Sequence, residues 1–272
     1  MVEIAICLAI IGVALVAIIG VLPLGMRTQR DNRQQTVVNQ DATVILEDLR
    51  NGVRNGDDLT NYVYAISNYW AAYKNGAKQS GPQQVDGYTY ASSQIYPKTG
   101  RNQLTPQPLY LTNNMNIIGV LSMPEYLDAT NFQPYSGVPN GWYFSNHIVA
   151  YVRSLSGPAI EKPPQDNAIV LNNSFGYRVF CVNAPVAMDT NQLTYNQALG
   201  LYGSSPYYAQ LAASLHELRL TFLWPQLPNG TVGNGRQSYR AMIAGQIMQT
   251  NLYSQWLYFY QPQTFNNVAA QP

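Results

Sequence analysis

Few side chains in this sequence could carry out acid–base or metal chemistry. The only histidines are His147 and His216. A zincin site needs two histidines four residues apart on a helix, and His216-Glu217 has no second histidine at that spacing. Because a metal site needs several convergent ligands, we expect both histidines to be structural or surface residues. We predict no metal site and no cofactor.

The motifs for nucleophilic, phosphate and calcium chemistry are weak. Cys181, within Phe-Cys-Val-Asn, fits a small buried hydrophobic residue better than a nucleophile. Gly230, Gly233 and Gly235 lie between expected strands and not before a helix, so turns explain them better than phosphate binding. Asp57-Asp58 lacks EF-hand spacing, and a solvated turn is the simpler interpretation than a calcium loop. The sequence therefore predicts no catalytic residue and no enzyme.

Charge and composition narrow the class of protein. The chain has 272 residues with 15 Lys and Arg against 14 Asp and Glu, a net charge of +1. Only 11% of residues are charged, against about 25% in ordinary soluble domains. A protein that wraps nucleic acid needs a basic excess, so no nucleic-acid partner is predicted. We instead expect uncharged residues to form the polar surface, since the chain has 25 Asn, 23 Gln and 21 Tyr.

Aromatic clusters and glycosylation sequons suggest binding more than catalysis. One aromatic cluster lies early in the sequence, and a later one alternates so that three rings share one strand face. Core packing is one explanation, and a subunit interface or glycan contact is the other. The early cluster is Tyr62, Tyr64, Tyr69, Trp70 and Tyr73, the late one is Trp256, Tyr258 and Tyr260, and the sequons begin at Asn172 and Asn229.

An uncharged apolar run extends from Ile4 to Leu24. Its 21 residues would form a helix of about 30 Å, the thickness of the hydrocarbon core of a bilayer. A secretory signal peptide is the alternative, but no Lys or Arg precedes the run and no Ala-x-Ala site ends it. We therefore expect a membrane span.

Glu3 lies at the front edge of this run and has two interpretations. It could remain in the headgroup layer and favour the helix N-terminus through the macrodipole. Alternatively it awaits a positive partner, such as the N-terminal amine at Met1 of a neighbouring chain, because carboxylates near lipid are usually functional or paired.

The start of the chain resembles the N-terminal helix of type IV pilins and pseudopilins. It has a glutamate near its start, a glycine nine residues later and a proline beyond it. Here these residues are Glu3, Gly12 and Pro23. The family's glutamate is the fifth residue of the mature chain, whereas Glu3 is third, so we expect two residues to be missing before Met1, a shorter start being the alternative. Pro23 also falls about three places later than the usual proline. The segments Leu218–Trp224, 225–230 and 233–237 further resemble the larger, PilV-like pilin-like proteins.

The resemblance implies a filament whose core is built from the apolar helix. It implies that the helix can melt between glycine and proline on assembly, with Gly12, Gly20 and Pro23 as breaking residues. The residues expected to pack in the filament core are Ile4, Leu8, Ile11, Leu15 and Ile18.

The second half of the N-terminal helix is expected to be amphipathic. Apolar residues recur at helical spacing, and Asn55-Gly56 is the expected end. The domains predicted are a helix over 1–55 and a head over 56–272. The stripe consists of Val38, Ala42, Ile45, Leu49 and Val53.

The head is expected to be rich in β-strands, with irregular structure from Gly56 to Gly141. The fold class is α+β, with the long helix packed on an antiparallel sheet in a pilin-like lollipop. Strands are expected at Trp142–Val152, Ala168–Leu171, Tyr177–Val182, Leu218–Trp224, Ser238–Ala244 and Tyr253–Tyr260, with a hairpin connection over 228–235 and helices at Tyr62–Trp70 and Tyr207–Leu215.

The sequence thus predicts a structural subunit of an extracellular type IV pilus or similar filament, anchored in the inner membrane before assembly. Its expected partners are copies of itself, the cytoplasmic membrane, the assembly machinery with its prepilin peptidase, and glycans. The alternatives are a minor pseudopilin of a type II secretion system and a membrane-anchored glycan-binding surface protein.

Overall fold

A computed structural model gives the arrangement of thirteen stretches of the chain. They are residues 2–52, 59–74, 77–78, 84–89, 111, 113–128, 142–154, 175–186, 195–196, 201–202, 214–227, 230–252 and 255–261. The chain divides into two compact units, residues 1–40 and residues 41–272.

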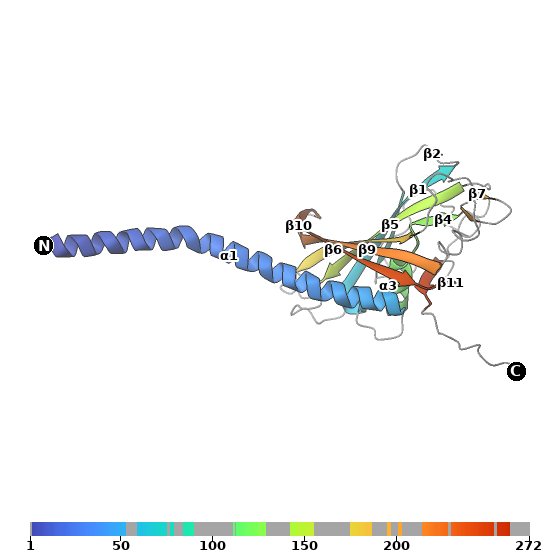
Figure 1. Ribbon diagram of the computed structural model, residues 1–272, viewed down its shortest axis with the longest axis horizontal. Helices are drawn as coiled ribbons and strands as arrows, with labels where there is room; N and C mark the ends of the chain where they lie inside the picture. The colour runs from blue at the N-terminus through green and yellow to red at the C-terminus, as the bar shows by residue number, and fades with distance from the viewer. Residues whose placement is uncertain are drawn as a thin grey trace. The chain divides into compact units, whose positions relative to one another are not determined.

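The first element, α1 (Val2–Asn51), is one continuous helix (Figure 1). Pro23 lies inside it, where it has no N–H to donate to the carbonyl of Ile19. Thr28 and Thr36 donate hydroxyl hydrogen bonds to the carbonyls of Leu24 and Asn32, so these side chains add no unsatisfied polar group.

The helix ends earlier than expected. Gly52 has a φ of 53°, and its N–H donates to the carbonyl of Asp48 over 3.1 Å, which is the usual glycine C-cap. The expected end at Asn55-Gly56 is therefore wrong, because Gly52 already offers the left-handed conformation. The described members of the apolar stripe, Val38, Ala42, Ile45 and Leu49, are all buried, as expected; Val53 lies outside the described residues.

The described strands form a large antiparallel sheet of eight strands and two small two-stranded sheets. The large sheet has the order β10-β9-β6-β5-β1-β2, with β3 paired to β1 and β4 to β5 (Figure 1). Its strands are β1 (Val63–Lys74), β2 (Ala77–Lys78), β3 (Gln84–Thr89), β4 (Tyr126–Asp128), β5 (Trp142–Arg153), β6 (Gly176–Pro185), β9 (Leu215–Gln226) and β10 (Val232–Ala244). The small sheets pair β7 (Tyr195–Asn196) with β8 (Leu201–Tyr202) and β11 (Ile247–Leu252) with β12 (Gln255–Tyr260).

The α+β layout with an antiparallel sheet is confirmed, and four predicted strands correspond to β5, β6, β9 and β10. The hairpin between β9 and β10 is also present, with Gly230 at a φ of 80°. The last predicted strand is β12 from residue 255 onward. The predicted strand 168–171 and most of the predicted helix 207–215 lie outside the described residues, and Leu215 begins β9.

Two predictions for the first part of the head are wrong. Tyr62–Trp70 is not a helix: a four-residue helix, α2 (Leu59–Tyr62), is followed directly by β1. The four-residue spacing of Ile66 and Trp70 fits a helix, but aromatic and β-branched residues favour a strand. The stretch treated as irregular also contains β2, β3, β4 and α3 (Asn114–Leu121), whose N-cap Asn113 accepts from the N–H of Asn116 over 2.8 Å.

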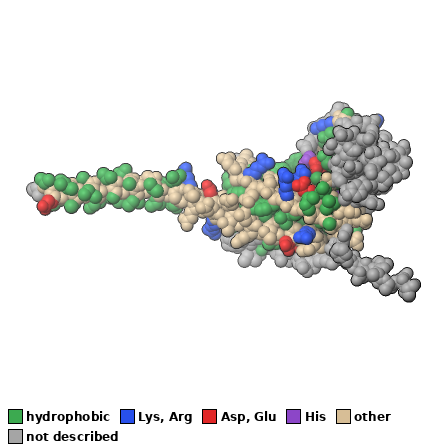
Figure 2. All heavy atoms as spheres, viewed as in Figure 1, with side chains coloured by type: hydrophobic (Ala, Val, Ile, Leu, Met, Phe, Trp, Pro, Cys, Tyr) green, Lys and Arg blue, Asp and Glu red, His purple; other side chains and the backbone are tan. Residues whose placement is uncertain are grey.

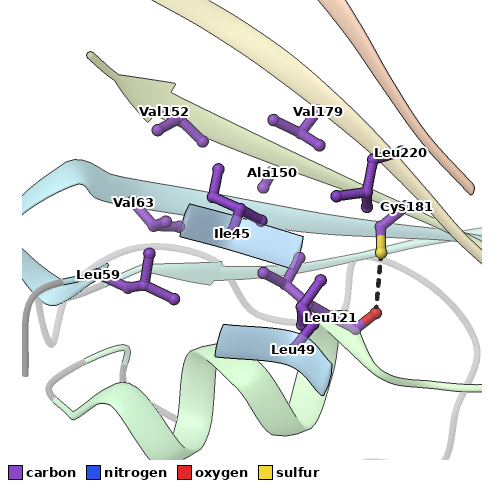
Figure 3. A pocket seen from close by; sticks show the side chains of 10 residues that line it. All are labelled: Ile45, Leu49, Leu59, Val63, Leu121, Ala150, Val152, Val179, Cys181 and Leu220. Atoms are coloured by element: carbon purple, nitrogen blue, oxygen red, sulfur yellow. Dashed lines mark hydrogen bonds between the residues drawn. The ribbon is translucent and has the colours of Figure 1, made fainter. Parts of the chain in front are cut away.

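The end of α1 packs on one face of the large sheet. Ile45 and Leu49 line a small pocket with Val152, Val179 and Leu220 of β5, β6 and β9 (Figure 3). The other lining residues are Leu59, Val63, Leu121, Ala150 and Cys181. Because no charged side chain lines this pocket, it serves core packing and offers nothing that would orient a polar ligand.

Buried amides hold the segment after α3 against the same face. Asn183 of β6 donates to the carbonyl of Ser122 over 2.7 Å. Asn68 of β1 donates to the side-chain oxygen of Asn146 of β5 over 3.1 Å, and all three asparagines are buried. Neutral amides therefore link these core segments, which costs less than burying charged side chains at the same positions.

Gly119 of α3 allows β12 to approach closely. A Cβ added at Gly119 would lie 2.7 Å from Cβ of Leu257, a buried residue of β12. We expect Gly119→Ala to lower the free energy of unfolding of the detergent-solubilised full chain by about 1–2 kcal/mol in urea. Overpacking costs about 1–3 kcal/mol, and the gain of about 1 kcal/mol in helix propensity only partly offsets it.

Gly176→Ala is the matched control, because its added Cβ would have its nearest neighbours at an ordinary 3.7 Å. Equal stability of Gly119→Ala and the control would contradict close packing of α3 on β12.

Candidate functional site

The N-terminal part of α1 presents a large apolar surface. Every large apolar side chain from Val2 to Met26 is 53–73% exposed. The most apolar 18-residue window has a mean hydropathy of 3.1 and none of it is buried, and apolar side chains cover this part of the helix in Figure 2. By length and composition, this helix could cross a membrane. A monomer in water rarely exposes apolar patches beyond about 600 Å², so this surface requires a cover.

One stripe of this surface has the spacing of a helix–helix seam. The residues predicted to pack in a filament core recur at intervals of four and three, which places them along one side of the helix. The glycines beside them are open, because a Cβ added at Gly12 or Gly20 would meet nothing within 4 Å. The stripe consists of Ile4, Leu8, Ile11, Leu15 and Ile18, and its packing in a filament stays a prediction.

Glu3 lies in the first turn of α1. A carboxylate there interacts favourably with the positive end of the helix dipole, so the helix alone accounts for an acidic residue at this end. Met1 lies outside the described residues. The pairing of Glu3 with an amine of a second chain stays a prediction.

A buried hydrogen bond fixes the other end of α1 in the head. The hydroxyl of Tyr177 in β6 donates to Oδ2 of Asp41 over 2.8 Å, and the two residues are 0% and 1% exposed. Burial, followed by the nearby Asp41 charge, raises the pKa of Tyr177 well above its ordinary value. Because a rotation or slide of the helix would separate these atoms, the bond selects one register of α1 on the sheet.

Of the side chains considered for catalysis, His147 lies on the surface, and His216 and Cys181 are buried. Nε2 of His147 lies 3.8 Å from Oε1 of Glu125 on the surface, whereas His216 is buried with its ring 5.9 Å from that of Tyr260. The thiol of Cys181 is buried and donates to the carbonyl of Leu121 over 3.1 Å. Burial raises the pKa of Cys181 to about 12, so the reactive thiolate is disfavoured. Within the described ranges, no three His, Cys, Asp or Glu residues group to hold a metal ion.

The glycine-rich stretch is part of the hairpin between β9 and β10. Gly230 is in the turn, but Gly233 and Gly235 belong to β10, which corrects the view that all three serve turns. A Cβ at Gly233 would lie 2.6 Å from Cδ of Pro225, and one at Gly235 would overlap the ring of Trp224. Close approach of β9 explains these two glycines. Asp57-Asp58 and the sequons at Asn172 and Asn229 lie outside the described residues.

The strand alternation divides the aromatic clusters between two faces. Trp70 is buried, with its ring 5.7 Å from that of Phe144, and Tyr258 and Tyr260 of the late cluster are buried as well. Core packing therefore accounts for these three rings. In contrast, Tyr64 and Tyr69 are half-buried, and the ring of Tyr64 lies 6.1 Å from that of Tyr151.

The sequence reasoning missed an arginine-bearing face of the sheet. The near-zero net charge concealed it, and each of the four strands by itself holds only one or two arginines. Their side chains share one face only because neighbouring strands pair in a particular register. They are Arg153, Arg178, Arg219, Arg236 and Arg240.

No protein-family model matches this chain, and neither the curated proteins nor the solved structures contain a match.

The bond between Asp41 and Tyr177 predicts a specific loss of stability. We expect Tyr177→Phe to lower the free energy of unfolding at pH 7 by about 1–3 kcal/mol, because the buried carboxylate loses a donor. The measurement is urea unfolding of the full chain in detergent, with Tyr62→Phe, at another half-buried tyrosine, as the matched control. An equal effect of the two substitutions would contradict the role of this bond.

The same groups predict a loss of stability at alkaline pH. The folded-state pKa values of Tyr177 and Cys181 are raised, so their contribution is complete below the unfolded-state values of 10.0 and 9.0. It is lost as the pH rises through the folded-state values. We expect the free energy of unfolding to fall above about pH 9, and to fall less steeply in Tyr177→Phe. A wild-type stability that is constant from pH 8 to 11 would refute this.

Proposed function

We propose that this chain is a structural subunit of an extracellular filament of the type IV pilus kind. In this proposal the N-terminal part of α1 anchors the subunit in the cytoplasmic membrane before assembly. The same apolar surface then packs against α1 of other copies in the filament core. The part of the chain from Asp41 onward forms the coat.

The observation that carries the proposal is the exposed apolar surface of α1. The same helix that exposes apolar side chains from Val2 to Met26 buries Ile45 and Leu49 in the head. Because this part of α1 is apolar on all sides, other copies of α1 could pack against it as lipid does, and the stripe from Ile4 to Ile18 is the side that we expect at the packing seam. The resemblance carried by Glu3, Gly12 and Pro23 supports the same proposal.

Glu3 would select the register of the subunits. Transfer of an apolar helix from lipid to a helix bundle changes little hydrophobic free energy, so packing and polar pairs must determine how helices associate. A carboxylate in an apolar filament core would be stabilised by the N-terminal amine of a neighbour, because an unpaired buried charge is costly. The head would face water through its amide-rich, sparsely charged surface.

We expect Glu3→Ala to enter the membrane normally but to reduce filament yield at least tenfold, since the loss of one buried ion-pair partner costs about 3–5 kcal/mol. The measurements are membrane fractionation and the amount of this chain in sheared surface material. Asp31→Ala is the matched control, because Asp31 is an exposed carboxylate on the same helix outside the apolar run. A normal filament yield from Glu3→Ala would refute the role of Glu3.

Electron microscopy of that sheared material tests the filament itself. We expect filaments in which mass spectrometry finds this chain as the main component with a methylated N-terminus. Long homopolymers of the purified protein would exclude a minor pseudopilin of a secretion system. Membrane-bound chain without any filament would exclude the proposal.

Assembly is also expected to change α1. The single chain is helical through Pro23, but the carbonyl of Ile19 has no N–H partner there. Neighbouring helices can tolerate such freed backbone groups better than lipid does. We expect an extended stretch between Gly12 and Pro23 in a filament reconstruction, and a continuous helix in that map would disprove it.

A further inference from the structure

Four strands of the large sheet carry their charged residues on the face opposite the end of α1. Val152, Val179 and Leu220 point toward the end of α1, so the residues that alternate with them point the other way. Strands β5, β6, β9 and β10 hold six charged residues, five arginines and Glu217, and all six alternate onto this opposite face. The face therefore carries a clear positive excess in a chain whose net charge is only +1.

Part of this face is an ordered set of stacked rings and guanidinium groups. The guanidinium carbon of Arg178 lies 5.0 Å from the ring centre of Tyr151, and that of Arg153 lies 5.1 Å from the ring centre of Tyr64. The register continues from Tyr151 to Arg178 and, through β9, to Arg236. We call these five residues the arginine–tyrosine row: Tyr64, Tyr151, Arg153, Arg178 and Arg236.

Among the charged residues of these four strands, the positive excess is greatest at the row. At the other end of the face, Glu217 accepts from Nε of Arg219 over 2.9 Å and lies 3.6 Å from Arg240, so this one carboxylate offsets half of the charge of the two arginines. No acidic residue of the four strands lies near the row. Arg178 also donates to the carbonyl of Gly230 in the hairpin turn, which holds its guanidinium in place.

The row has the chemistry to hold carboxylates beside sugar rings. A guanidinium group has a planar edge of N–H donors that matches a carboxylate, and Arg236 of the row is exposed. Tyrosine rings offer apolar faces with a hydroxyl at the rim, suited to surfaces that are partly apolar and partly wet. Leu223, half-buried between Arg178 and Arg236 in the register, adds an apolar contact for the C–H groups of a sugar.

We propose that the arginine–tyrosine row binds an acidic polysaccharide whose sugars carry carboxylates, laid across strands β5, β6, β9 and β10. A second copy of α1 fits less well, because its exposed middle presents Arg27, Arg30 and Arg33 against one acid, Asp31. Duplex DNA also fits less well, since tight binding uses about six or more phosphate contacts and the row supplies three arginines.

The test uses the full chain in detergent, so that it does not depend on filament assembly. Oligogalacturonate is the acidic probe, and its methyl ester is the matched neutral probe. We expect saturable binding of the acidic probe by calorimetry at low salt, weakened by added salt, and no binding of the ester. Arg236→Gln and Arg178→Gln should each weaken binding about tenfold, the usual value of a charged hydrogen bond.

Arg50→Gln is the control variant, because Arg50 is exposed at the end of the helix that covers the opposite face, and its binding should equal that of the wild type. Arg178 also contacts the turn, so Arg178→Gln could unfold the head. In that event, binding by Arg236→Gln, at an exposed residue, is the test. Absence of binding, or unchanged binding by Arg236→Gln, would overturn the proposal. Equal binding of the methyl ester, or tighter binding of duplex DNA with the same arginine dependence, would also overturn it.

Discussion

The exposed apolar surface of α1 is the constraint on which the rest of the molecule depends. At about 25 cal/mol for each Å² of apolar area, a helix that exposes every large apolar side chain from Val2 to Met26 cannot remain uncovered in water. A bilayer or a bundle of identical helices would cover this surface. The free energy of the apolar side chains would be similar in the two environments, because lipid tails and Leu side chains are similarly apolar. The free-energy difference between the two environments must therefore come mainly from the polar groups at the helix ends.

The two halves of α1 differ in how their apolar side chains are distributed around the helix. The first half is apolar on all sides and has no intrinsic orientation. The second half has one buried stripe and a buried carboxylate, Asp41, that meets Tyr177. The head thereby defines which side of the second half faces the sheet.

The sequence predicted the parts of this structure that have a long and consistent pattern. The apolar run, the stripe from Val38 to Leu49 and the alternation in β5, β6 and β9 each repeat often enough to identify a helix or a strand. Strand β1 was misassigned because Ile66 and Trp70 satisfy both periods. The arginine–tyrosine row could not be predicted, because it depends on the register between strands far apart in the sequence, which local patterns do not determine.

The attachment of α1 to the head also has a mechanical consequence. Asp41, Ile45 and Leu49 hold successive turns of the helix against strands that lie far from it in the sequence. A pull along the helix axis is therefore shared by several side-chain contacts. Such contacts have to slide past one another together before the helix can leave, so the head resists tension along α1 better than it resists peeling from its last turn.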